Sequence, residues 1–213
     1  MSSVAVIDYG MGNLHSIAKA LQHADPQTQV QISADAKVIQ DADRVVFPGV
    51  GAIRDCMQSL RALNLVEPIM QAAREKPFLG VCLGMQALLT DSEENGGIGC
   101  LNLFPGHVRR FTDGLRDQHG GILKVPHMGW NRVKQKSHPL WHNIAQDSRF
   151  YFVHSYFVTP DREEDSIATS DYPDPFTCAL ARDNMFAVQF HPEKSQEVGL
   201  QLLQNFLRWD GAA

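Results

Sequence analysis

Short apolar runs alternate with amphipathic segments along the first half of the chain. Residues 4–7 are uninterrupted apolar residues, as in a strand buried on both faces of a parallel sheet. The next segment begins at Asn13, a candidate N-cap, and carries apolar residues at helical spacing: Leu14, Ile17, Ala18 and Leu21. The pattern therefore predicts a strand followed directly by a helix.

The same alternation continues as far as residue 82. Val30 and Ile32 alternate with polar residues as in a second strand, and residues 44–47 form a third, which Pro48-Gly49 is expected to end. Helices are predicted at about 52–63 and 66–74, and an apolar strand over 78–81 leads into Cys82. Strands that alternate with helices predict a parallel sheet with right-handed connections.

The second half of the chain has a different pattern. Turn residues, rather than long helices, separate four short strand-like pieces: around Val108, around Val125, at 150–153 and at 186–190. A last helix is predicted from Ser195 as N-cap, with Val198, Leu202 and Phe206 on one stripe. We therefore expect one α/β domain over 1–213, with a mostly parallel central sheet flanked by helices and a mixed or antiparallel extension.

Composition narrows the possible functions. The chain has 213 residues, 44% of them hydrophobic, and a net charge of -5 with scattered basic residues, which is not the pattern of a nucleic-acid-binding protein. It lacks a basic leader, a run of ~20 apolar residues and any cysteine or histidine spacing typical of zinc sites. We expect a cytoplasmic protein without cofactor, metal or membrane span, whose ligands are small molecules or proteins.

Cys82 is the first candidate for chemistry. Residues 80–84, GVCLG, are a thiol version of the glycine-flanked elbow at which a strand turns sharply into a helix and presents a nucleophile. A sulfur at the start of a helix is favoured as thiolate. The alternative is a buried cysteine that packs as a small apolar side chain.

Two further segments carry residues that a nucleophilic cysteine needs. The predicted strand at 186–190 leads into His191-Pro192-Glu193, where extended backbone would place the imidazole and the carboxylate on one side. Residues 47–51, FPGVG, follow another strand and could present backbone N–H groups to an oxyanion. Taken singly, His191 fits a solvated histidine equally well, and the glycines fit the end of a strand.

A dinucleotide site is the rival use of glycine in this chain. Gly10-Met11-Gly12 follows the first strand, but His15 replaces the third glycine of the Gly-x-Gly-x-x-Gly fingerprint. The sequence also lacks a Gly-Lys-Ser or Gly-Lys-Thr phosphate loop. Nucleotide binding is therefore not predicted.

The three motifs together resemble the class I, triad-type glutamine amidotransferases. They are GVCLGMQ at 80–86, His191-Pro192-Glu193, and Pro48-Gly49-Val50-Gly51. Three more stretches are similar to those of the glutaminase subunits of imidazole glycerol phosphate synthases, of histidine biosynthesis: DYGMGN at 8–13, PHMGWN at 126–131 and YFVHSY at 151–156. The resemblance covers essentially the whole chain.

This resemblance implies a function for each motif. Cys82, His191 and Glu193 would form a triad that removes ammonia from glutamine through a thioester. The backbone N–H groups of Val50 and Leu83 would bind the oxyanion. The implied substrate-binding residues are Gly49, Gly51, Gln86, Ser155 and Tyr156. The alternative for Gln86 is a solvent-facing helix residue.

The resemblance also implies a partner, a (β/α)8-barrel cyclase subunit that uses the ammonia. The residues expected at that interface or along the ammonia path are Asn13, Met128, Trp130, Tyr151 and Lys194. Met128 and Trp130 are otherwise ordinary core residues. Three alternative functions stay open: a glutaminase for another ammonia acceptor, a thiol hydrolase of peptides or γ-glutamyl compounds, and a binding subunit without catalysis.

Overall fold

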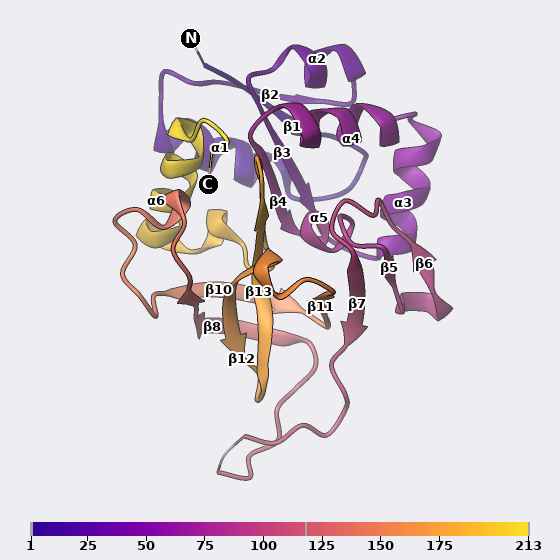
Figure 1. The fold of residues 1–213 in the computed structure, drawn as a ribbon, viewed down its shortest axis with the longest axis vertical. Helices are drawn as coiled ribbons and strands as arrows, with labels where there is room; N and C mark the ends of the chain where they lie inside the picture. The colour runs from indigo at the N-terminus through magenta and orange to yellow at the C-terminus, as the bar shows by residue number, and fades with distance from the viewer. Residues whose placement is uncertain (1, 118, 213) are drawn as a thin grey trace.

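A computed structural model describes residues 2–117 and 119–212. Its centre is a sheet whose first five strands are parallel and lie in the order β2-β1-β3-β4-β14 (Figure 1). Their bounds are β1 Ser3–Ile7, β2 Gln29–Ser33, β3 Arg44–Gly49, β4 Phe78–Cys82 and β14 Met185–Val188. The mostly parallel sheet predicted from the apolar runs is confirmed.

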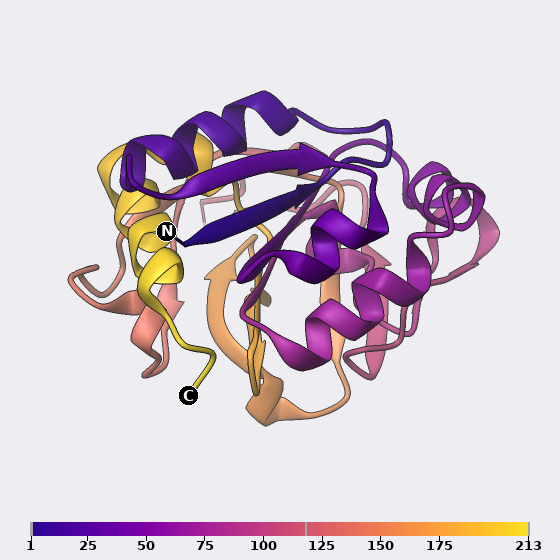
Figure 2. The ribbon, with the colours of Figure 1, turned by 90° about the horizontal axis from the view of Figure 1, so that it is seen from above.

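Helices cover both faces of this sheet, as Figure 2 shows from above. One face carries α1 (Leu14–Ala24) and α6 (Gln196–Arg208); the other carries α2 (Ala36–Asp41), α3 (Ile53–Ala62) and α4 (Val66–Glu75). Strand β1 divides its side chains between two cores, with Val4 and Val6 facing α1 and α6 and the alternate residues facing the other helices. Burial on both faces is why the run at 4–7 is apolar throughout.

The second half of the chain extends the sheet with mainly antiparallel strands. Strand β13 pairs antiparallel with β14, and β11, β7, β5 and β6 follow. Strand β12 also pairs with β13, and β9 pairs with β12. These strands are β5 Asp91–Ser92, β6 Ile98–Gly99, β7 Gly106–Arg110, β9 Lys134–Gln135, β11 Tyr156–Pro160, β12 Ser166–Asp171 and β13 Pro175–Arg182. The predicted antiparallel extension is therefore confirmed.

A separate two-stranded sheet is formed by β8 (His127–Arg132) and β10 (Arg149–His154). The described residues between β7 and β8 extend away from the sheets at the bottom of Figure 1. A short helix, α5 (Leu83–Gln86), follows β4 directly. The 3-10 turns of the described residues are η1 Glu94–Gly96, η2 Pro139–Trp141, η3 Glu163–Asp165 and η4 Pro192–Lys194.

Several local predictions were wrong. Val125 lies outside every strand, and β8 starts two residues later. Pro48 and Gly49 do not end β3 but belong to it, because they continue its ladder with β4. Neither Asn13 nor Ser195 caps its helix through the side chain; the Ser195 hydroxyl instead donates to the His191 carbonyl at 2.7 Å.

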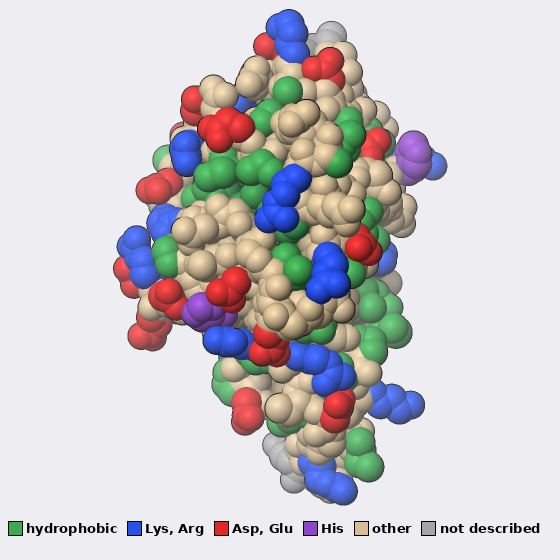
Figure 3. Space-filling view, turned by 90° about the vertical axis from the view of Figure 1, so that its right-hand side faces the viewer, with side chains coloured by type: hydrophobic (Ala, Val, Ile, Leu, Met, Phe, Trp, Pro, Cys, Tyr) green, Lys and Arg blue, Asp and Glu red, His purple; other side chains and the backbone are tan. Residues whose placement is uncertain are grey.

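The charges on the surface and the lengths of the helices are relevant to binding of nucleic acid and membranes. Figure 3 shows acidic and basic side chains intermixed on one face rather than gathered by sign. Among the described residues, no helix is long and apolar enough to cross a membrane.

The elbow after β4 depends on close packing. Cys82 has φ 54° and ψ -109°, a conformation that costs an L-residue about 1 to 3 kcal/mol and is kept only where the surroundings impose it. Two residues on, Gly84 passes directly over β3, so a Cβ there would lie 1.9 Å from the Phe47 carbonyl oxygen. The glycine is required because two backbones meet at this point.

We expect Gly84→Ala to destabilise the fold by about 3 kcal/mol, because the methyl group would force β3 and the elbow apart. Urea unfolding measures the loss. Gly99→Ala is the matched control, since a Cβ at Gly99 meets nothing within 4 Å. Equal stability of the two variants would contradict this account of the elbow.

Candidate active site

Three chain segments end together at one edge of the sheet. The β3–β4 register places Gly49 opposite Cys82, and the β4–β14 register places Val188 opposite Val81. The residue after Val188, Gln189, is therefore level with Cys82. Carboxyl ends of parallel strands are where open α/β sheets bind their ligands.

His191 and Glu193 meet beside this edge. The distance from His191 Nδ1 to Glu193 Oε1 is 2.8 Å, and both side chains are at least 96% buried. The predicted extended backbone is wrong here, because Glu193 lies in the 3-10 turn η4. The turn brings the carboxylate back toward the imidazole that precedes it.

The environment makes the His191 imidazole unusually basic. Burial by itself lowers its pKa, but hydrogen bonding and charge from Cys82 and Glu193 outweigh burial and raise the pKa of His191 to about 10. In the described residues, His191 Nε2 and Glu193 Oε2 are buried without a well-formed hydrogen bond. The Nε2 atom is thus free to exchange a proton with a bound group.

A cavity of about 340 Å³ opens in front of Cys82. It is lined by all the predicted substrate and oxyanion residues except Gly49: Val50, Gly51, Leu83, Gln86, Ser155 and Tyr156. His191 and the unanticipated residues Glu94, Pro126, Val153 and His154 complete the lining. Gly49 lies instead beside a much narrower cleft behind the triad, together with Asn13, His191 and Glu193.

Tyr9 packs against the loop Pro48-Gly49-Val50-Gly51, here called the glycine loop. Its hydroxyl, almost fully buried, donates to the Pro48 carbonyl at 3.1 Å, and a Cβ on Gly49 would lie 2.4 Å from that hydroxyl oxygen. Burial raises the pKa of Tyr9 far above its usual range, so the hydroxyl stays protonated. Val50, next along the loop, is 37% exposed. The loop therefore rests on a fixed donor on one side and borders the cavity on the other.

Sequence reasoning missed two residues at this site. Gln189 is fully buried, and its Nε2 lies 3.7 Å from Cys82 Sγ. Its position two residues before His191 was a usable signal, because alternate residues of extended chain share a side. Glu94 reaches the cavity from η1, and its carboxylate accepts from the Ile53 N–H at 3.0 Å; no local pattern marks it.

The residues expected to face a partner lie on one surface of the β8–β10 sheet and near the triad. Met128 is 61% and Trp130 42% exposed, which excludes the alternative that they are core residues. Trp130 pairs with Tyr151 across the strands, their rings 6.1 Å apart. Lys194 is exposed at the end of η4. The Tyr151 carbonyl accepts from the His191 N–H at 2.9 Å, which links this sheet to the triad.

The other three cysteines are free thiols away from the cavity. Burial raises the pKa of Cys56 and of Cys100 to about 12 and that of Cys178 well above its usual value. The described residues contain no group of three His, Cys, Asp or Glu side chains that could hold a metal ion.

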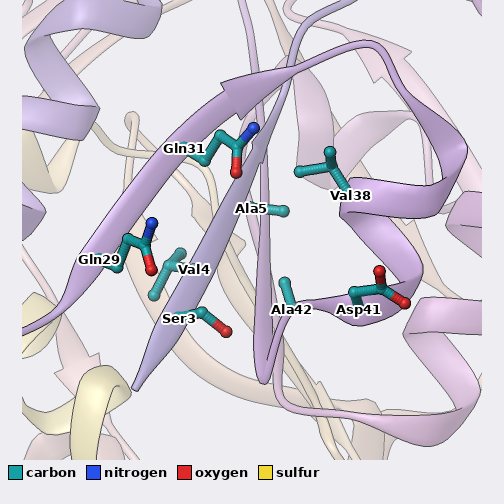
Figure 4. Close-up of a pocket in the computed structure, with 8 residues that line it drawn as sticks. All are labelled: Ser3, Val4, Ala5, Gln29, Gln31, Val38, Asp41 and Ala42. Carbon is teal, nitrogen blue, oxygen red and sulfur yellow. The ribbon is translucent and has the colours of Figure 1, made fainter. Parts of the chain in front are cut away.

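A second hollow lies far from the triad. It is a shallow space of about 160 Å³ between β1, β2 and α2 (Figure 4). Its acidic residue, Asp41, is paired with Lys37 at 2.6 Å. Its lining holds no cysteine or histidine, and the Ser3 hydroxyl donates to Asp43 at 3.0 Å, so it lacks the cysteine–histidine pair of the first cavity.

Comparison with known proteins agrees with this geometry. The family model described as glutamine amidotransferase class-I matches residues 5–209. The chain is 63% identical over 212 residues to imidazole glycerol phosphate synthase subunit HisH of Methylococcus capsulatus, covering 99% of this chain and 98% of that protein. The protein of the same name from Nitrosococcus oceani is 56% identical over 214 residues, all of both chains.

Solved structures share the fold at lower identity. A putative GMP synthase component of Thermoplasma acidophilum is 18% identical, covers 98% of this chain and 93% of its own, and has a TM-score of 0.69. PurLQS of Thermotoga maritima is 16% identical, with coverages of 97% and 98% and a TM-score of 0.70. These likenesses confirm the predicted fold class.

Glu193→Gln should lower the pKa of His191 by one unit or more, because the charge that favours the imidazolium is lost. NMR titration of the His191 ring measures the change. A folded-state pKa raised to about 10 stabilises the fold below pH ~6.5, and this contribution disappears as pH rises through about 10. The stability advantage of the wild type over Glu193→Gln should follow the same course.

Glu197→Gln provides the control for that titration. It removes an exposed carboxylate from the first turn of α6 without touching the His191 ring. An equal shift in both variants would contradict the assignment of Glu193 as the partner of His191.

Proposed function

The chain belongs to the class I glutamine amidotransferases, in the group of the imidazole glycerol phosphate synthase subunit HisH, and we propose that it hydrolyses glutamine at Cys82. The observation that carries the proposal is the meeting of three groups at one cavity. Cys82 lines it from a strained elbow, and the buried pair of His191 and Glu193 lies beside the sulfur. Histidine biosynthesis is the pathway in which this group acts.

The proposed reaction has two halves. The Cys82 thiolate attacks the side-chain amide carbon of glutamine, and the tetrahedral intermediate collapses to a thioester as His191 gives its proton to the departing nitrogen. Ammonia leaves. His191 then takes a proton from water, which attacks the thioester, and glutamate and the Cys82 thiolate are released. Glu193 holds the imidazole and stabilises its protonated form.

Backbone N–H groups are proposed to stabilise the oxyanion in both halves of the reaction. We assign this role to the N–H groups of Val50 and Leu83, residues that line the cavity together with Cys82. One such donor is typically worth ~2.7 to 4 kcal/mol of transition-state stabilisation. The Tyr9 hydroxyl under Pro48 bears on this step, because it fixes the peptide that precedes the loop.

The cavity fits a small amino acid. Glu94 carries a carboxylate on its wall and is our candidate for the α-ammonium group of glutamine. Gly51, Ser155 and Tyr156 are proposed to bind the rest of the amino-acid end. Gln86 is 4% exposed, so it is not a solvent-facing helix residue. We propose that it also contributes to binding glutamine.

Ammonia must be used before water protonates it, which calls for a second subunit docked close to the triad. We propose a (β/α)8-barrel cyclase, with which this chain forms a cytoplasmic heterodimer. Two observations support the docking face: the exposed aromatic surface of Trp130 and Tyr151, and the narrow cleft that passes Asn13 behind the triad. Lys194, exposed at the end of η4, is proposed to join this face, and the cleft is the proposed start of the ammonia path.

Cys82→Ala should reduce glutamate release by at least about 10⁴-fold, because no other group on the cavity wall replaces the nucleophile. The assay compares glutamine hydrolysis with and without the barrel partner and its ligand. Cys100→Ala is the matched control and should keep activity, since its thiol lies away from the cavity. Turnover by the Cys82 variant, or cleavage of peptides in place of glutamine by the wild type, would overturn the proposal.

Trp130→Ala should weaken binding of the barrel partner about 30-fold, as expected when a large aromatic anchor worth ~2 kcal/mol is truncated. Isothermal titration of the two subunits gives the affinity. Leu63→Ala, which truncates a similarly exposed apolar residue at the end of α3, should leave it unchanged. Equal affinities of wild type and Trp130→Ala would remove the β8–β10 face from the interface.

A further inference from the structure

A buried amide lies against the sulfur and has no part in the mechanism above. Gln189 follows β14 at the level of Cys82, is fully buried, and has its Nε2 3.7 Å from the Cys82 sulfur. Its backbone N–H is already used, donating to the Cys178 carbonyl at 2.9 Å. The Gln189 backbone is therefore held in place, and its side-chain amide lies next to the Cys82 sulfur.

The direction of the Gln189 amide follows from its neighbours. Gln86 Nε2 lies 3.2 Å from the Tyr156 carbonyl oxygen and 3.0 Å from Gln189 Oε1. A backbone carbonyl can only accept, so Gln86 must turn its NH₂ group toward Tyr156. The second N–H of that group then requires an acceptor, which Gln189 provides with its oxygen. The Gln189 NH₂ group is left facing the sulfur as a donor.

The same carbonyl is held from its other side by two buried histidines. His154 Nδ1 donates to the Tyr156 oxygen at 2.7 Å, and His127 Nδ1 donates to His154 Nε2 at 2.9 Å. Asn131 Nδ2 closes the chain by donating to His127 Nε2 at 3.2 Å, while it also donates to the Asp171 carbonyl at 2.9 Å.

Each hydrogen bond in this series from Asn131 to Tyr156 contains one hydrogen. Neither histidine ring can therefore accept a further proton without breaking a hydrogen bond. Burial agrees with this arrangement, because it lowers the pKa of His127 to about 4 and that of His154 to about 3. The neutral rings hold the Tyr156 carbonyl in place, and with it both glutamine amides.

We propose that Gln189 is a positioning residue of the nucleophile: its amide donates a hydrogen bond to the Cys82 sulfur and holds it ionised beside His191, in a direction fixed by Gln86. The inference rests on the proposed function in taking Cys82 as the nucleophile. A thiolate accepts more strongly than a thiol, so the bond favours the reactive form. Gln189 and His191, two residues apart, thus contact the sulfur from one strand end.

The test measures ionisation of Cys82 rather than turnover. Iodoacetamide alkylates the thiolate, and mass spectrometry of the Cys82 peptide follows its rate against pH. We expect Gln189→Met, which keeps the volume and removes the donor, to move the midpoint of the profile up by about one pH unit. The rate at neutral pH should fall about tenfold. An unchanged midpoint in the folded variant would overturn the inference.

A second variant separates positioning from packing. Gln189→Glu keeps the shape but turns a carboxylate oxygen toward the sulfur, so its midpoint should lie above that of Gln189→Met. A structural role alone predicts one midpoint for all folded variants. The other titratable groups near the sulfur, His191, Tyr9 and Glu94, are unchanged in both.

Asn205→Leu is the matched control. It removes another buried amide, which donates to the carbonyls of Leu140 and His142, and none of these three residues lines the cavity. We expect it to lower stability and leave the alkylation midpoint in place; a shift equal to that of Gln189→Met would show a general loss of packing and overturn the inference.

Kinetics of the complex with the barrel subunit complete the test. Gln189→Met should lower kcat for glutamine about tenfold with little change in KM, because it alters the nucleophile and not the cavity wall. If the wild type releases no glutamate from glutamine, the proposed function fails, yet the alkylation profiles still decide the role of Gln189. If glutamine is hydrolysed and the profiles coincide, only the Gln189 inference fails.

Discussion

The parallel register of β3, β4 and β14 is the constraint on which the site depends. It brings Gly49, Cys82 and Gln189, which are far apart along the chain, to one level of one edge. The elbow can hold Cys82 in a strained conformation because Gly84 lets two backbones touch there. Strand pairing thus supplies both the convergence and the rigidity that the chemistry requires.

Local sequence patterns were enough to predict the main strands and helices of the parallel sheet. Continuous apolar runs marked β1, β3 and β4, because a strand that is buried on both faces has apolar side chains at successive positions. Helical spacing marked α1 and α6 for a related reason, that one stripe of each is buried. Strands β12 and β13 were missed; two register shifts interrupt the pairing of β12 with β13 and so break the regular alternation of side chains.

Side-chain contacts over long separations were beyond such patterns. The GVCLG and HPE motifs identified Cys82 and His191, but the turn that folds Glu193 back was predicted as extended chain. The contacts that hold Glu94 and Gln189 span 41 and 107 residues: Glu94 accepts from the Ile53 N–H, and Gln189 lies 3.7 Å from the Cys82 sulfur. No local pattern marks Glu94, whereas the position of Gln189 two residues before His191 was the one signal that the sequence offered.

The unequal burial of the four thiols has a practical consequence. Cys56, Cys100 and Cys178 stay protonated at neutral pH because the protein interior disfavours their charged forms, whereas Cys82 opens onto the cavity beside an imidazolium. A small electrophile that enters the cavity would therefore meet the Cys82 sulfur and none of the other three thiols.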